Sequence, residues 1–182
     1  MNPYLRKIIL AFFLTILIIV GIMYYRLAPY KEVFISEIKN KEFHMVYVDH
    51  VGPYHKIVKS IEKVEAWAKK HAIPCDLSFG EYLDNPDQVP EDRLRSRAGC
   101  LLNSESVLKL SDGMKFKINS PQDFVLAEFS GSPAVGPFVV YPKVKEWFQK
   151  NKKQIGSPII EVYEISNGRS EIKTYYYFPY GS

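Results

Sequence analysis

The stretch SPIIEVYEI places one carboxylate, Glu161, among apolar and aromatic residues. Its β-branched and aromatic composition predicts a strand, and successive side chains of a strand point to opposite faces. Ile159, Glu161 and Tyr163 then share one face, while Ile160 and Val162 share the other. A carboxylate between an isoleucine and a tyrosine suits a ligand that is both cationic and apolar, because aromatic rings attract cations and the acid supplies the opposite charge. The pattern therefore predicts binding chemistry before catalysis.

Glu161 has two alternative roles. In the first, it lies exposed at a strand edge beside a lysine such as Lys173, which is the commoner fate of a glutamate. In the second, it acts with Trp147 or a tyrosine to activate water in a hydrolase of reactive small molecules. Trp147 lies at helical spacing from Val144, however, which favours a place in the core. We expect binding without an enzymatic reaction, and hydrolysis stays an alternative.

No other group of residues indicates a metal, cofactor or nucleic-acid site. Cys75 and Cys100 lack a CxxC spacing, and they fit either two buried thiols or one disulfide. The net charge of +4 is mild, and the lysines are scattered among acids instead of forming a basic block. We therefore predict no metal, no cofactor and no nucleic-acid partner. Metal-ligand spacing is also missing among the four histidines, His44, His50, His55 and His71.

The N-terminus carries the most specific signal. An apolar run covers residues 8–23, and at about 1.5 Å per residue this run and the tyrosines after it approach the thickness of a bilayer core. Basic residues precede the run, and tyrosines and Arg26 follow it, as is typical of groups at a membrane interface. A cleaved signal peptide is the alternative, but Pro29 directly follows the only small residue available for cleavage. We predict a single-pass anchor at residues 1–25, with the following domain on the extracytoplasmic side.

The rest of the chain divides into a charged connector, residues 26–42, and one domain, residues 43–182. Strand and helix signals in this domain follow the order β-α-β-β twice. We predict strands at 43–51, 77–83, 97–102, 123–131, 158–165 and 172–180, and helices at 53–68 and 142–153.

A comparison of the sequence with itself supports an internal repeat at about residues 43–103 and 123–180. An offset of 80 positions pairs Glu81 with Glu161 and gives six identities in one short region. The predicted fold class is α+β. Two β-α-β-β repeats of the SHS2 type form a curved antiparallel sheet with the helices on one face, preceded by one transmembrane helix.

In this arrangement, the uncovered faces of the two units meet in a concave seam. Ile160 and Val162 suit the helix side of their strand, which leaves Glu161 on the open face. The repeat then places Phe79 and Glu81 on the matching face of the first unit. The seam is the predicted ligand site.

Three stretches resemble one protein family: YLDNPDQVPEDRLRSRAG, PKVKEWF and PIIEVYE. They are similar to the GyrI-like small-molecule-binding family, over about residues 43–180. The resemblance is strongest to the membrane-anchored branch that includes the testis-expressed ER-phagy receptor. It implies duplicated β-α-β-β modules and a pocket faced by the acidic residue of an E-x-Y strand. In this chain that pattern falls on Glu161 and Tyr163.

The chain departs from the family in two respects. No helix-turn-helix module precedes the domain, so the resemblance implies no role in transcription. The sequence ends at Ser182 without a long tail carrying an autophagy-receptor motif, so an ER-phagy role is not implied either.

Together, these patterns predict a membrane-anchored ligand sensor that binds an amphipathic, cationic small molecule. The competing hypothesis is an adaptor that uses the same fold to bind a protein partner, with bulky side chains filling the seam. The predicted ligand-binding residues are Glu161, Tyr163, Phe79, Glu81, Tyr175, Tyr177 and Trp147.

Overall fold

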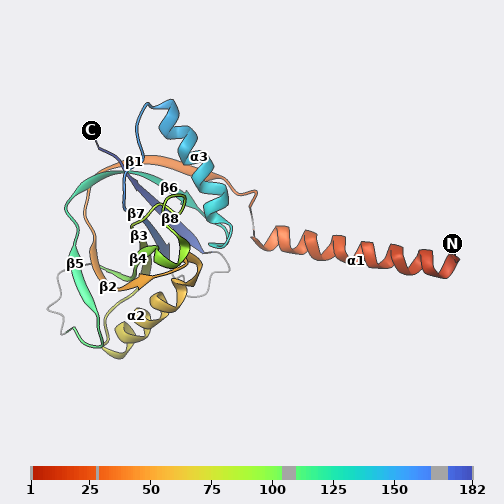
Figure 1. Cartoon of the computed structure of the whole chain (residues 1–182), viewed down its shortest axis with the longest axis horizontal. Helices are drawn as coiled ribbons and strands as arrows, with labels where there is room; N and C mark the ends of the chain where they lie inside the picture. Colours follow the sequence, from red (N-terminus) through yellow and green to blue (C-terminus); the bar gives the residue numbers. More distant parts are fainter. Residues whose placement is uncertain (1, 28, 104–109, 165–171, 182) are drawn as a thin grey trace.

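A long apolar helix stands apart from the rest of the chain. The computed structural model describes residues 2–27, 29–103, 110–164 and 172–181. Helix α1 (Pro3–Leu27) projects away from the sheet, and none of its described residues is buried (Figure 1). Its length and hydropathy allow it to cross a bilayer, a test that a signal sequence near an N-terminus also passes.

Within the described residues, antiparallel strands form one open sheet of eight strands in the order β1-β6-β8-β7-β3-β4-β2-β5. The two strands in the middle, β3 (Leu77–Tyr82) and β7 (Ile159–Glu164), pair along their whole length. β-branched and aromatic residues are frequent in these strands because they pack well on a pleated surface. The other strands are β1 (Val33–Lys41), β2 (His44–Val51), β4 (Arg95–Leu102), β5 (Lys115–Ile118), β6 (Gln122–Phe129) and β8 (Lys173–Pro179).

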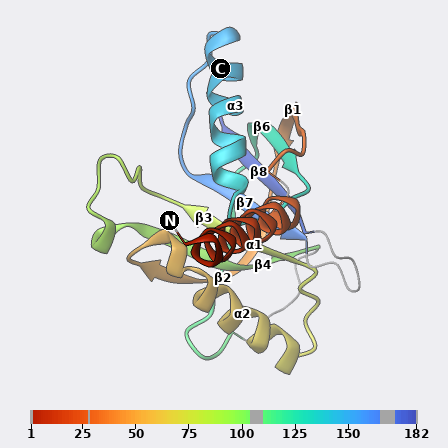
Figure 2. The ribbon, with the colours of Figure 1, turned by 90° about the vertical axis from the view of Figure 1, so that its right-hand side faces the viewer.

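Two helices cover the same face of this sheet (Figures 1 and 2). Helix α2 (Val58–Lys70) follows a short 3-10 turn at Tyr54–Lys56, and it buries Val64 against β2 and β4. Helix α3 (Gly136–Lys150) buries Val144 against β6 and β8. Apolar residues recur in both helices at spacings of three and four, which gives each helix one apolar face for the sheet.

Large buried side chains of the strands fill the other face of the sheet, on which the sequence predicted an open seam. Ile160 and Val162 belong to this cluster, so the prediction that they face the helices was wrong. Both faces of β7 are buried, so strand alternation alone does not tell which face the helices cover. The buried cluster consists of Phe43, Met45, Tyr47, Phe79, Phe124, Leu126, Ile160, Val162 and Tyr177.

The order β-α-β-β occurs twice along the chain, as β2-α2-β3-β4 and β6-α3-β7-β8. An origin by duplication stays a prediction. Two strands were not predicted from the sequence, and both lie at the edges of the sheet. One of them, β1, lies within residues 26–42, so the segment expected to be a connector contributes a strand that pairs with β6.

Helix α3 begins before its predicted start at Pro142, which lies inside the helix. This proline has no N–H, so one backbone hydrogen bond is missing in the second turn of the helix. The true start is Gly136, and a Cβ at this position would lie 1.9 Å from the hydroxyl oxygen of Tyr176. Only glycine therefore allows the helix to begin this close to β8.

Cys75 and Cys100 form a disulfide, which was one of the two arrangements that the sequence left open. The bond ties the segment between α2 and β3 to strand β4. It therefore adds a covalent link between the covering helix layer and the sheet.

Candidate ligand-binding site

Glu161 occupies the middle of β7, at the centre of the sheet. It lies opposite Gly80 of β3 and Tyr176 of β8 in the two strand pairings. Its side chain points to the face that the helices cover, because it contacts Tyr141 of α3. The prediction that Glu161 and Tyr163 share a face is confirmed, since both line one cavity. The prediction that this face is the one without helices was wrong.

Three tyrosines surround the carboxylate of Glu161. The hydroxyl of Tyr141 donates to Oε1 at 2.9 Å, and the hydroxyl of Tyr163 donates to Oε2 at 3.0 Å. The hydroxyl oxygen of Tyr82 lies 3.1 Å from that of Tyr163. Because Tyr163 uses its only proton for Glu161, Tyr82 is the donor in this second pair. The network holds the carboxylate in one orientation.

Burial raises the pKa of Glu161 to about 7, although the two tyrosine hydrogen bonds act in the opposite direction. The residue is 5% exposed. Among the described residues, no lysine or arginine contributes to this pKa. Burial also raises the pKa of Tyr82, Tyr141 and Tyr163, so these hydroxyls stay neutral donors. Near neutral pH about half of the Glu161 carboxyls are therefore ionised. No basic side chain in the described part of the chain contributes a balancing charge.

The carboxylate lies in a cavity of about 1370 Å³ between α2 and α3. Walls of apolar and aromatic side chains with a few polar groups are typical of small-molecule sites. The described residues contain no group of three His, Cys, Asp or Glu side chains that could hold a metal ion. Side chains from both helices and from the central strands form the walls, including Ile57, Ile61, Tyr82, Pro137, Phe138 and Tyr141.

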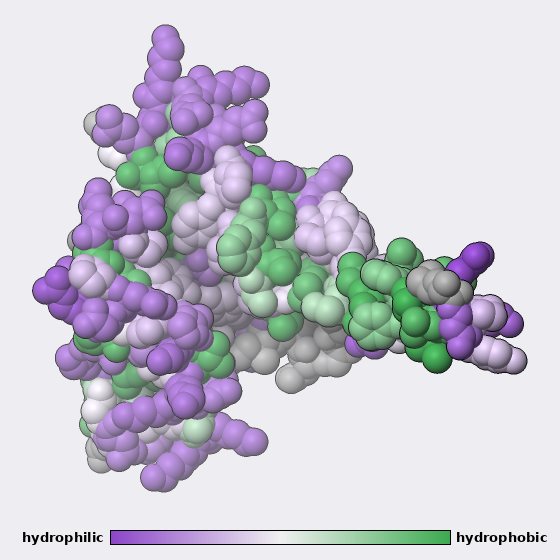
Figure 3. All heavy atoms as spheres, turned by 45° about the vertical axis from the view of Figure 1, so that its right-hand side comes forward, coloured by the Kyte–Doolittle hydropathy of each residue, from purple (hydrophilic) through white to green (hydrophobic). Residues whose placement is uncertain are grey.

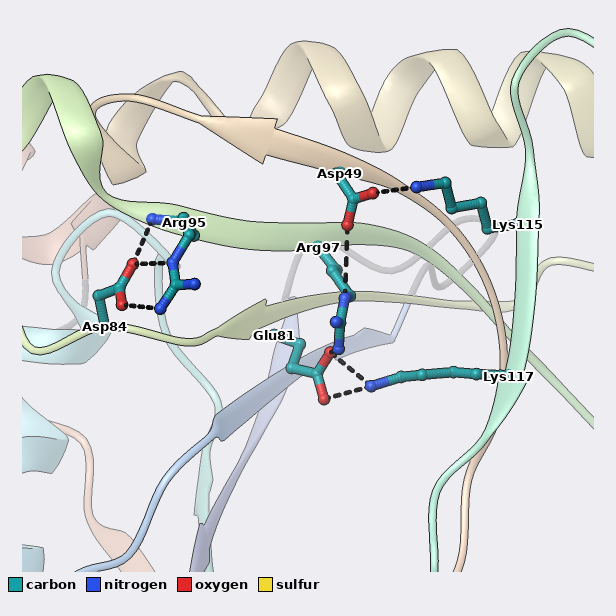
Figure 4. Close-up of polar contacts among 7 residues, drawn as sticks. All are labelled: Asp49, Glu81, Asp84, Arg95, Arg97, Lys115 and Lys117. Atoms are coloured by element: carbon teal, nitrogen blue, oxygen red, sulfur yellow. Dashed lines mark hydrogen bonds and ion pairs between the residues drawn. The ribbon is translucent and has the colours of Figure 1, made fainter.

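Glu81, the second predicted carboxylate, lies on the opposite face of the sheet, because it pairs with Ile160 of the cluster on the face without helices. Figure 4 shows it together with Arg97 and Lys117. It is 2% exposed, and its Oε2 accepts a hydrogen bond from Nη1 of Arg97 at 3.0 Å. Nζ of Lys117 lies 2.5 Å from its Oε1. Its charge is thus balanced by two cations of the chain itself. The prediction that Glu81 and Glu161 share one face was wrong.

The other predicted residues also lie away from Glu161. Phe79 and Tyr177 belong to the buried cluster on the face without helices. Tyr175 and Tyr177 line a smaller cavity of about 770 Å³ on that face. Trp147 of α3 packs against the cluster around Phe148, next to Lys153. Of the predicted residues, the structure brings only Glu161 and Tyr163 together in the large cavity.

The cavity residues that were missed in the sequence include three with aromatic rings, Tyr82, Phe138 and Tyr141. Phe138 and Tyr141 precede the proline at which the helix was expected to begin. The Gly-Pro pair at residues 136–137 is the signal that could have found them, because proline is favoured in the first turn of a helix. Tyr82 follows Glu81 directly, so it lies on the other face of β3.

Curated relatives of this chain include DNA gyrase inhibitors. The protein of Citrobacter koseri is 29% identical over 141 residues, which cover 71% of this chain and 81% of the relative. The protein of Klebsiella pneumoniae is 30% identical over 59 residues, which cover 32% of this chain and 38% of the relative. In that second comparison the chain spans well under half of the relative's length.

Solved structures with the same fold share little sequence with this chain. The C-terminal domain of EcmrR has a TM-score of 0.61 at 16% identity, and the match covers 83% of this chain and 98% of that domain. A hydrolase from Listeria innocua has a TM-score of 0.56 at 13% identity, covering 81% and 91%. The structure of SAV2435 bound to tetraphenylphosphonium has a TM-score of 0.50 at 10% identity, covering 84% and 95%.

One protein family model matches residues 34–180 of this chain, from the start of β1 to the end of β8. Its description is the GyrI-like small molecule binding domain. The match includes the two helices, the central strands and Glu161. The chain therefore belongs to the GyrI-like family.

Proposed function

We propose that this chain is a membrane-anchored binding protein whose cavity takes an amphipathic organic cation. The observation that carries the proposal is Glu161, a buried carboxylate with a pKa of about 7 and no basic partner contributing to it among the described residues. An ionised carboxylate is costly to bury without a counter-charge. A cation in the cavity removes that cost, so binding is driven by the pairing as well as by apolar contact.

The walls of the cavity define the rest of the ligand. Tyr141 and Tyr163 hold the carboxylate, and their rings, with that of Phe138, offer surfaces for stacking and cation–π attraction. A ligand with its charge spread over aromatic groups fits such walls better than a small hydrated ion does. The tetraphenylphosphonium bound to SAV2435, a protein of the same fold, supports this choice of chemical class.

The anchor and the side of the membrane belong to the same proposal. Helix α1 would hold the domain at the membrane, as in the membrane-anchored branch that the sequence resembles, and the domain would act there as a ligand sensor. The disulfide between Cys75 and Cys100 supports a location outside the cytosol, because disulfides persist in oxidising compartments. We therefore infer an extracytoplasmic domain.

Of the two alternative functions, the cavity argues against the adaptor, whereas hydrolysis stays a second candidate. The adaptor hypothesis expected bulky side chains in place of a cavity, and the volume beside Glu161 counts against it. Hydrolysis stays the second candidate, because a carboxylate with a pKa of about 7 suits a general base near neutral pH. The Listeria innocua hydrolase has the same fold, which is compatible with this reading. Turnover that Glu161→Gln abolishes while the protein stays folded would establish it.

The binding proposal is tested with the full chain in phosphatidylcholine nanodiscs, titrated with tetraphenylphosphonium and with neutral triphenylphosphine oxide. Calorimetry is the suitable readout, because Trp147 lies outside the cavity and its fluorescence does not report occupancy directly. We expect saturable binding of the cation, weak binding of the neutral compound, and loss of the preference for the cation in Glu161→Gln. Glu128→Gln, on the face without helices, is the matched control. Equal binding of both compounds to wild type and Glu161→Gln would refute the proposal.

A further inference from the structure

Exposed apolar side chains surround the entrance of the cavity. Phe138 is 80% exposed and Val58 is 53% exposed, on the two helices that flank the cavity. Ile155 and Ile172 also line the cavity and are 40% and 46% exposed. Large apolar side chains gathered around one opening mark a surface that another apolar phase covers.

The end of α1 lies at this entrance. The backbone N–H of Ser132 donates to the carbonyl oxygen of Leu27, the last residue of α1, at 3.2 Å. Ser132 directly precedes Pro133 and Ala134, which line the cavity. Figure 2 looks along α1 and shows it in front of the space between α2 and α3, and Figure 1 shows it leaving the domain on the helix-covered side. The apolar helix therefore points away from the same face on which the cavity opens.

The apolar surface is continuous across this junction. In Figure 3 the hydrophobic surface of α1 meets hydrophobic atoms of the domain at its base. Tyr24 and Tyr25 lie at this end of α1, and Tyr30 follows, with its ring 5.7 Å from that of Tyr24. Tyrosines favour the level of the lipid headgroups. These tyrosines therefore place the lipid headgroups at the end of α1 that lies beside the cavity entrance.

We propose that the entrance of the cavity docks on the headgroup layer of the membrane that holds α1, so that ligands enter the cavity from the lipid. Both parts of this inference rest on the proposed function: the docking of Phe138 and Val58 on lipid rests on the membrane anchor α1, and the entry of ligand rests on the proposed cation. A lipid surface is the occupant that the molecule itself provides, because α1 brings the bilayer to the entrance. An amphipathic cation in the outer part of a leaflet then reaches Glu161 by passing between α2 and α3.

Docking is measured by quenching of tryptophan fluorescence by lipid. The full chain is placed in vesicles of phosphatidylcholine, with or without a dibrominated phosphatidylcholine whose bromine atoms quench fluorescence on contact. Phe138→Trp and Val58→Trp report from the two sides of the entrance. Ile118→Trp is the control, because Ile118 is 38% exposed on β5, an edge strand on the far side of the domain from α1 (Figure 1). The signal of wild type, with Trp67 and Trp147, is subtracted from each variant.

We expect the brominated lipid to cause a larger loss of fluorescence in both entrance variants than in Ile118→Trp. Equal loss in all three variants would overturn the docking. Calorimetry with tetraphenylphosphonium on the same vesicles separates this result from the proposed function. Quenching without cation binding supports docking and refutes the ligand, whereas cation binding without quenching supports the ligand and refutes docking.

Discussion

Replacing Glu161 by glutamine is expected to stabilise the protein, although it removes the residue proposed to bind the ligand. In the unfolded chain the carboxyl has its ordinary pKa of 4.5, and in the folded protein burial raises the pKa to about 7. Between these two pKa values the unfolded chain releases its proton first, so the folded state loses stability as the pH rises. One pH unit of difference corresponds to about 1.4 kcal/mol. The ionisable glutamate therefore costs about 1 kcal/mol at pH 5 and about 3 kcal/mol at pH 8.

Glutamine has nearly the same size and cannot ionise, and its amide can still form hydrogen bonds with Tyr141 and Tyr163. The assay is urea denaturation of the full chain in mild detergent, followed through the fluorescence of the buried Trp67, at pH 5 and pH 8 without ligand. We expect Glu161→Gln to be more stable than wild type, and by about 2 kcal/mol more at pH 8 than at pH 5. The same difference at both pH values, or a less stable variant at pH 8, would refute the assignment of a buried and unbalanced carboxylate.

Further predictions follow from the same contacts. Tetraphenylphosphonium should bind about tenfold more tightly at pH 8 than at pH 6, because the carboxyl of Glu161 with its pKa of about 7 must lose its proton to pair with the cation; calorimetry should show no such dependence in Glu161→Gln. Tyr141→Phe removes a hydrogen bond that lowers the pKa of Glu161, so the pH at which binding strengthens should rise, and an unchanged midpoint would contradict the contact. Glu81→Gln should lower the free energy of unfolding, measured in urea, by about 2 kcal/mol, because it removes the carboxylate that pairs with Lys117 and one of the two that pair with Arg97. Loss of the disulfide in Cys75→Ala/Cys100→Ala should cost about 3 kcal/mol, and wild type under reducing conditions should match that variant.

Most of the helices and strands could be predicted from the sequence, because they depend on residue patterns within short stretches of the chain. The alternation in β7 correctly placed Glu161 and Tyr163 on one face, because the period of a strand is two. It could not choose the face, because Ile160 and Val162 are buried in a second cluster on the other side. The choice depends on which side the helices pack, and that is decided by contacts between residues distant in sequence.

The internal repeat misled the placement of Glu81 for a similar reason. An offset of 80 positions aligns Val64 of α2 with Val144 of α3, and both are fully buried. In the strands, however, Tyr82 and Tyr163 share the cavity, and they are 81 positions apart. A slip of one residue moves every side chain of a strand to the other face. Glu81 therefore meets Arg97 on the face opposite to Glu161.

The short connection between α1 and β1 limits how far the domain can lie from the end of the apolar helix. Five residues separate Leu27 from Val33. An extended chain covers at most about 3.5 Å per residue, so Val33, the first residue of β1, lies no further than about 20 Å from the end of the helix. With α1 in a bilayer, the domain diffuses in two dimensions together with the lipids. Its occupancy then follows the number of ligand molecules per area of membrane instead of their concentration in the surrounding water. Two compounds with equal affinity for the cavity would fill it unequally if one of them partitions less into lipid.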